Sequence, residues 1–312
     1  MGSFVVPVRR LLALAAIAIV AVTGVGGAEQ ANAHPTTAAD AVTIDASTLR
    51  AAAGDPDPQD FDPGRIISDY NFFNADSMTT GDVQEFLEAR DCRPRDDSPC
   101  LWEYREDTTS QPSQGDGHCD EYAGGKNQRA SAIIADVARA CAVSPRVLLV
   151  LLQKEQSLLS RPSESGYLRA TGYGCPDTAD CDTKYFGFFN QVYNAAWQFR
   201  QYTQEPVRDY HIGTVEVGFH PNAECGSSKV EIRNQATANL YNYTPYQPNE
   251  ALLASVESEG DSCSAFGNLN FWTFYTRWFG PSTSVRYPEF LDPCLNLVGG
   301  QPCRPATLIT AP

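Results

Sequence analysis

The chain has 312 residues, of which 20% are charged, and a formal net charge of −15. No stretch combines clustered Lys and Arg with aromatic residues, so the phosphate-neutralising contacts that drive nucleic-acid binding are missing and we exclude nucleic acid as a partner. The same acidity opposes long-range attraction to anionic wall polymers, so any binding to the wall would rest on aromatic contacts with neutral sugar.

The N-terminus has the pattern of an export signal. Arg9 and Arg10 precede an apolar run over Leu11–Val25, and small residues then lead up to Ala33. A run of about 15 residues is shorter than the ~20 that a membrane-spanning helix needs, so we expect cleavage after Ala33 rather than retention as an anchor. The mature chain, which has no later apolar run of spanning length, is therefore expected to be secreted and extracellular or associated with the cell wall.

Composition divides the rest of the chain into three parts. Residues 34–63 are rich in Ala, Thr, Asp and Pro and predict a flexible leader. Residues 64–280 carry the helical and strand patterns of a folded domain, with a disulfide-tied extension near its start. Residues 281–312 form an irregular tail that holds the last two cysteines.

The ten cysteines predict disulfides, because their number is even and all of them lie in the expected mature chain. Neither a C-x-x-C nor an H-x-x-x-H spacing occurs, so we expect no metal site and no cofactor. Many connectivities are open, and only the short Cys175–Cys181 loop is individually favoured. Pairing between sequence neighbours would give Cys92–Cys100, Cys119–Cys141, Cys175–Cys181, Cys225–Cys263 and Cys294–Cys303.

The first half of the domain carries three helical patterns. Residues 78–89 predict a short amphipathic helix that Thr79 or Thr80 caps, and residues 127–141 predict a second helix with one apolar stripe. Between these helices, residues 92–125 are polar and predict a disulfide-tied loop. Ser144 and Pro145 then supply an N-cap and a first-turn proline, and the six apolar residues Val147–Leu152 predict a helix that is buried on all sides.

The second half combines helices with one small hairpin. Residues 192–199 predict a helix, and alternation at 215, 217 and 219 and at 230 and 232 predicts two short paired strands. Helical patterns return at 236–241, 251–256 and 271–279. The expected fold class is therefore mainly α with a small β-hairpin (α+β), stabilised by disulfides.

Glu155 is the candidate acid. It follows Leu148, Leu151 and Leu152 by seven, four and three residues, so it projects from the face of the helix whose earlier turns lie in the core. A carboxyl group beside an apolar wall and at a helix C-terminus has its charged form disfavoured, as a general acid requires. The alternative is an ordinary solvated Glu at a helix end.

Aromatic and amide side chains gather after Glu155. Tyr173 precedes the cysteine loop, and Phe188 lies beside Asn190 and Gln191. Sugars bind by stacking their C–H faces on aromatic rings while amides bond their hydroxyl groups. These residues therefore predict a sugar site, and the alternative is that the aromatic residues are simply core.

Together these features resemble the lysozyme-like superfamily of lytic transglycosylases and muralytic glycosidases. The resemblance rests on the helix that ends in Glu155, the later Gly187–Gln191 segment and the run Ala238–Tyr246. It implies that Glu155 is the general acid, that Gln191 is an amide of the cleft and that Tyr243 or Tyr246 is a tyrosine near the acid. Residues 65–279 also resemble a group of secreted actinobacterial proteins sometimes labelled hemagglutinin-like.

The resemblance implies an enzyme that cleaves the MurNAc–GlcNAc bond of peptidoglycan, and we expect the protein to be a monomer. A hydrolase would need a second carboxylate, for which Asp177, Asp180 and Asp182 are candidates, whereas a lytic transglycosylase needs none. The competing interpretation is a non-catalytic, adhesin-like module that binds the cell wall or another carbohydrate on the same scaffold. A purely structural secreted protein is the third.

Overall fold

The computed structural model describes residues 56–115, 118–175, 180–255 and 257–285. The expected signal peptide, most of the leader, Asp177 and the Cys294–Cys303 pair lie outside the described residues. Within these ranges, no helix is both long enough and apolar enough to cross a bilayer.

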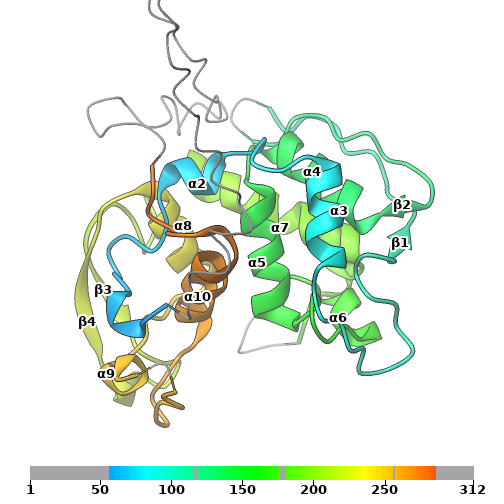
Figure 1. The fold of residues 1–312 in the computed structure, drawn as a ribbon. Coiled ribbons are helices and arrows are strands. Elements are labelled where there is room, and N and C mark those ends of the chain that lie inside the picture. Colours follow the sequence, from blue (N-terminus) through cyan, green and yellow to red (C-terminus); the bar gives the residue numbers. More distant parts are fainter. Residues whose placement is uncertain (1–55, 116–117, 176–179, 256, 286–312) are drawn as a thin grey trace, which may run out of the picture. The chain divides into compact units, whose positions relative to one another are not determined.

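The described part is mainly helical and contains two small antiparallel sheets of two strands each (Figure 1). Short 3-10 turns η1, η2 and η3 cover Pro58–Asp60, Thr183–Tyr185 and Ala223–Cys225. In chain order the helices and strands are α2 (Asp69–Phe73), α3 (Thr80–Glu88), β1 (Arg105–Glu106), β2 (Gln128–Arg129), α4 (Ala130–Cys141), α5 (Pro145–Gln156), α6 (Glu164–Leu168), α7 (Phe188–Gln204), β3 (Gly213–Gly218), β4 (Ser227–Ile232), α8 (Gln235–Tyr243), α9 (Glu250–Leu253) and α10 (Gly267–Phe279).

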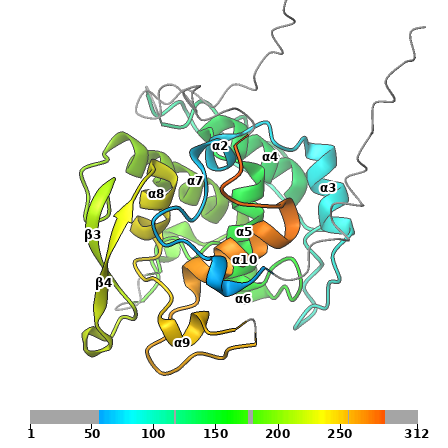
Figure 2. The same cartoon turned by 60° about the vertical axis from the view of Figure 1, so that its left-hand side comes forward.

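The central helix is α5, which packs against α10 and α4 (Figures 1 and 2). Its start is the expected one, because the Ser144 hydroxyl accepts a hydrogen bond from the Arg146 N–H and Pro145 occupies the first turn. Every residue of Val147–Leu152 is buried. The helix ends where Ser157 adopts a left-handed conformation with φ +55°. The polar last turn therefore directly follows six consecutive buried residues of the same helix.

In the N-terminal half, the predicted helix α3 is confirmed, and α4 is shorter than the predicted helix. Thr79 caps α3 in a reciprocal capping box with Asp82. The next predicted helix begins at Ala130 instead of residue 127, because Asn127 has φ +50° and the following two residues pair with β1. This β1–β2 ladder was not expected, since strands of two residues are too short to show alternation.

The second half confirms the hairpin. Strand β3 pairs with β4 in antiparallel register, from Gly213 opposite Ile232 to Gly218 opposite Ser227. The residues at 215, 217, 230 and 232 are buried, as the alternation predicts. Phe219 lies just beyond β3. In both views the hairpin stands beside α8, away from α3 (Figures 1 and 2).

Several boundaries differ from the sequence-based ones. Helix α7 begins at Phe188, four residues before the expected start, and α9 ends at Leu253. The folded part also begins before residue 64, because Pro58 and Phe61 are buried and the Phe61 ring packs edge-on against Trp272 at 5.9 Å. Helices α2 and α6 span five residues each, too few to show a helical period.

Four disulfides lie within the described residues, and all four join sequence neighbours as expected. One ties the N-terminal extension to the last residue of α4, and another ties the end of the β3–β4 hairpin to the segment before α10. The pairs are Cys92–Cys100, Cys119–Cys141, Cys175–Cys181 and Cys225–Cys263.

Candidate functional site

Glu155 lies in the last turn of α5, with 24% of its side chain exposed. One of its carboxylate oxygens, Oε1, forms an ion pair with the Nζ of Lys154, whose side chain is only 6% exposed. The same Nζ donates to the Thr244 hydroxyl at 2.9 Å. The carboxylate is thus partly accessible, and a buried ammonium holds it from one side.

A tight turn that contains two glycines covers Glu155. Gly172 and Gly174 both have φ +72°, a conformation that only glycine adopts readily. A Cβ on Gly172 would lie 3.4 Å from the Glu155 Oε2, and a Cβ on Gly174 would lie 2.6 Å from the Tyr185 ring. These glycines therefore bring the backbone of the turn close to the carboxylate on one side and to an aromatic ring on the other.

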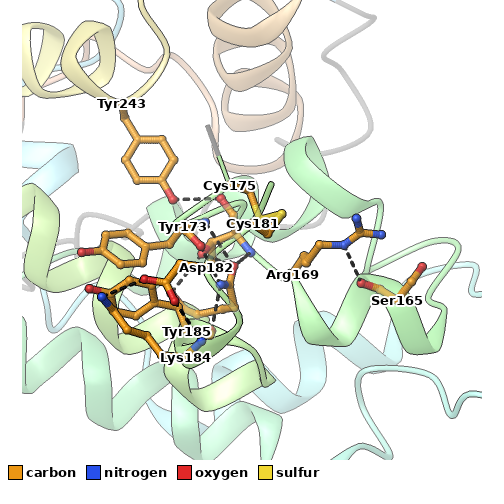
Figure 3. Close-up of a disulfide and its surroundings, with 11 residues drawn as sticks. Ser165, Arg169, Tyr173, Cys175, Cys181, Asp182, Lys184, Tyr185 and Tyr243 are labelled. Atoms are coloured by element: carbon orange, nitrogen blue, oxygen red, sulfur yellow. Dashed lines mark hydrogen bonds and ion pairs between the residues drawn. A yellow bond between two sulfur atoms is a disulfide. The ribbon is translucent and has the colours of Figure 1, made fainter. Parts of the chain in front are cut away.

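The turn forms one wall of a pocket of about 340 Å³. Tyr173 and Tyr185 meet at right angles, with ring centroids 4.7 Å apart (Figure 3). The Cys175–Cys181 disulfide stands at the edge of this wall. We name this cavity the tyrosine pocket; its lining residues are Gly172, Tyr173, Gly174, Cys175, Tyr185, Gln198, Tyr202 and Tyr243.

Three of the tyrosine hydroxyls in this pocket are harder to ionise than usual. Burial raises the pKa of Tyr173 to about 12, and the neighbouring Tyr185 adds to the shift. Burial also raises the pKa of Tyr202, and it raises that of Tyr243 well above its ordinary value, with a further contribution from the Glu155 carboxylate. These hydroxyls therefore remain protonated near neutral pH, so the pocket offers aromatic faces together with the neutral hydroxyl groups of Tyr173 and Tyr202.

The Tyr243 hydroxyl fixes the turn from the side of α8. It donates to the Thr171 carbonyl at 2.8 Å, and the Tyr243 ring packs against Phe199 at 4.9 Å. The structure therefore places the predicted tyrosine beside the predicted acid, as a wall of the tyrosine pocket. Tyr246 lies elsewhere, in a bridge with Gly218 at the end of the hairpin.

Gln191 lies in the core and holds the same turn from within. It is fully buried, and its amide nitrogen donates to the carbonyls of Tyr173 and Tyr185 at 2.8 and 2.9 Å. Its amide oxygen accepts from the N–H groups of Thr171 and Tyr173 at 3.2 and 3.1 Å. Because these bonds satisfy the amide internally, Gln191 positions the pocket wall and does not face a ligand.

The remaining predicted site residues do not line the pocket. Phe188 is buried against Tyr104, and the Asn190 amide donates to the Phe186 carbonyl in the first turn of α7. Asp182 is exposed, caps η2 and pairs with Lys184, which lowers the pKa of its carboxyl group. Asp180, the other acidic candidate within the described residues, is exposed as well.

Two pocket residues escaped the sequence analysis. Gln198 and Tyr202 line the cavity from α7; Gln198 lies within the predicted helical segment 192–199, and Tyr202 lies beyond its expected end. Their four-residue spacing was a usable signal, because it places both side chains on the same face of a helix. Within the described residues, no group of three or more His, Cys, Asp or Glu side chains is arranged to hold a metal ion.

The chain matches the sequence model of one known family. The sequence model of the family described as "LasA, N-terminal domain" matches residues 65–289, which is most of the chain. The protein belongs to the LasA N-terminal domain family. No curated protein and no solved structure matches it. The match includes every residue of the tyrosine pocket together with Glu155, so this LasA N-terminal domain carries the whole candidate site. Its resemblance to the lysozyme-like superfamily stays a prediction.

Proposed function

We propose that the protein is secreted and acts on the cell wall by cleaving the glycan strand of peptidoglycan, with Glu155 as the general acid. The observation that carries this proposal is the position of the Glu155 carboxylate beside Gly172, which is itself a wall residue of a pocket lined by four tyrosines. The family assignment supports a role at the wall, because LasA is itself a secreted staphylolytic peptidase. Aromatic faces suit sugar rings, and protonated hydroxyl groups suit their substituents.

The proposed chemistry needs a single carboxyl group. Glu155 transfers its proton to the oxygen that links N-acetylmuramic acid to N-acetylglucosamine, and the C1–O bond breaks through an oxocarbenium-like state. The C6 hydroxyl of the muramoyl unit then attacks C1 and returns its proton to Glu155. Among the described residues that line the pocket there is no Asp or Glu, and Glu155 itself lies beside Gly172 rather than among them. The transglycosylase route is the one proposed because it needs no carboxylate besides Glu155.

One observation favours a second candidate, a non-catalytic wall-binding module. The Glu155 carboxylate is held by the nearly buried ammonium of Lys154. A carboxyl group that donates a proton must first leave such an ion pair, whereas a binding site has no need to open it. In this alternative the tyrosine pocket binds glycan and Glu155 only shapes its wall.

Labelled sacculi separate the two candidates. The mature wild-type protein is compared with Glu155→Gln and with Glu164→Gln, a matched change at an exposed position in the first turn of α6. We expect wild type and Glu164→Gln to release soluble label and Glu155→Gln to bind sacculi without release. Binding without release by all three would favour the wall-binding module. Equal release by Glu155→Gln would overturn the role of this residue. If the wild-type protein neither binds sacculi nor releases label, both candidates are refuted.

A further inference from the structure

Two cationic side chains lie over rings that line the tyrosine pocket. The Lys184 Nζ lies 4.6 Å from the centroid of the Tyr185 ring, and the Arg208 guanidinium carbon lies 5.0 Å from that of Tyr202. Both rings line the pocket. The cations come from separate segments, η2 and the loop after α7, so the fold brings each of them against a ring of the same cavity on a chain whose net charge is −15.

Exposed carboxylates partner both cations. Lys184 pairs with Asp182 at 2.7 Å, with side chains 64% and 45% exposed, and Arg208 pairs with Glu205 at 2.8 Å, with side chains 29% and 62% exposed. Ion pairs this exposed typically contribute about 0–1 kcal/mol. A carboxylate on a bound ligand can therefore share or replace either partner at little cost.

The rings hold the cations in place while the carboxylate partners remain open to solvent. A cation over an aromatic face is attracted by the ring quadrupole, which fixes its position without neutralising its charge. The hydrogen bond with Asp182 raises the pKa of Lys184, so its ammonium stays charged near neutral pH. Figure 3 shows the polar ends of Tyr173, Tyr185 and Lys184 on the same side of the turn. The hydroxyl donors and the ammonium together form a rim suited to an anionic group.

We propose that Lys184 and Arg208 make the tyrosine pocket selective for a saccharide that carries a carboxylate. The inference rests on the proposed glycan site and adds the chemical class that the site prefers. The tyrosine faces bind the sugar ring, as in a neutral glycan, and the two cations read a free lactyl carboxylate, which muramic acid carries where no peptide stem is attached. Neutral saccharides lose only this second contribution, so they bind more weakly without being excluded.

A matched pair of ligands tests the selectivity. Calorimetry in the Glu155→Gln background, which prevents turnover, compares a neutral N-acetylglucosamine tetramer with an alternating GlcNAc–MurNAc tetrasaccharide. We expect tighter binding of the carboxylated ligand. Lys184→Gln and Arg208→Gln should each reduce this preference by roughly two- to fivefold, while affinity for the neutral tetramer stays the same. Lys229→Gln, at an exposed position on β4, serves as the control and should change neither affinity.

Ionic strength provides an independent reading, because salt screens exposed charges. The preference for the carboxylated ligand should shrink between 0.05 and 0.5 M salt, whereas binding of the neutral tetramer should not change. Equal affinity for both ligands, or an equal loss for both in Lys184→Gln, would overturn the inference and leave the glycan site standing. Failure of both ligands to bind would instead refute the proposed function.

Discussion

Replacing Gln191 with methionine removes one amide that joins α7 to the turn over Glu155. The amide bonds to four backbone groups, namely the N–H groups of Thr171 and Tyr173 and the carbonyls of Tyr173 and Tyr185. A net hydrogen bond contributes about 1 kcal/mol, and a buried group left without a partner costs about 1–3 kcal/mol. Four such groups would give at least about 4 kcal/mol. Local movement that admits water lowers the expected cost to roughly 3–4 kcal/mol.

Urea unfolding of Gln191→Met and of a matched variant measures this cost. Gln198→Met makes the same chemical change two turns along α7, at a half-buried residue of the pocket wall. We expect that control to lose under about 1 kcal/mol, as is usual for positions outside the core network. Glycan binding should fall in both variants, because one loses the shape of the wall and the other a polar contact. If Gln191→Met lowers the free energy of unfolding by less than about 1 kcal/mol, the proposed role of Gln191 in holding the turn over Glu155 is refuted.

Three further predictions follow from the same structure. A double-mutant cycle of Lys154→Met and Glu155→Gln, measured by denaturant unfolding, should give a coupling free energy of about 1–3 kcal/mol, because each single change leaves a partly buried charged partner unpaired. A coupling near zero would show that the ion pair does not contribute to stability. Replacing both Cys225 and Cys263, which are 38 residues apart, should lower the free energy of unfolding by about 4 kcal/mol, whereas replacing both Cys175 and Cys181, which are 6 apart, should lower it by about 2 kcal/mol, because the longer loop loses more entropy when closed. The reverse order in chemical denaturation would contradict this expectation. Burial raises the pKa of Tyr173 and Tyr275 from 10.0 to about 12. The stability that these groups contribute is therefore complete below pH 10 and is lost as the pH rises through 12. Tyrosinate absorbance should rise together with unfolding between these pH values, whereas full titration of the folded protein near pH 10 would contradict the burial of these rings.

The elements with strong local signals were predictable from the sequence. The start of α5 followed from Ser144 and Pro145, and its burial followed from six consecutive apolar residues. The hairpin followed from alternation at 215, 217, 230 and 232. In each case a single segment carries the pattern and the cap or turn residues agree with it. Elements of two to five residues, such as β1 and α2, have no such pattern.

The site was only partly predictable, because its contacts join distant segments. Glu155 could be singled out from its place on the helix, and Tyr243 does lie beside it. The ion pair with Lys154 was not foreseen, because neighbouring residues on a helix point in different directions and the contact arises from packing against Thr244. Gln191 was expected to face a ligand, but burial and four backbone partners direct its amide inward. Sequence alone does not reveal which polar groups will need that amide.

The most direct test of the central claim is the mass spectrum of the soluble fragments that the mature protein releases from sacculi. We predict glycan fragments with intact peptide stems and 1,6-anhydromuramoyl ends, in amounts that fall to background for Glu155→Gln. Fragments with new amino termini on uncut glycan strands would show instead that the protein cleaves peptide bonds, and that result would contradict the role assigned to Glu155 and the tyrosine pocket.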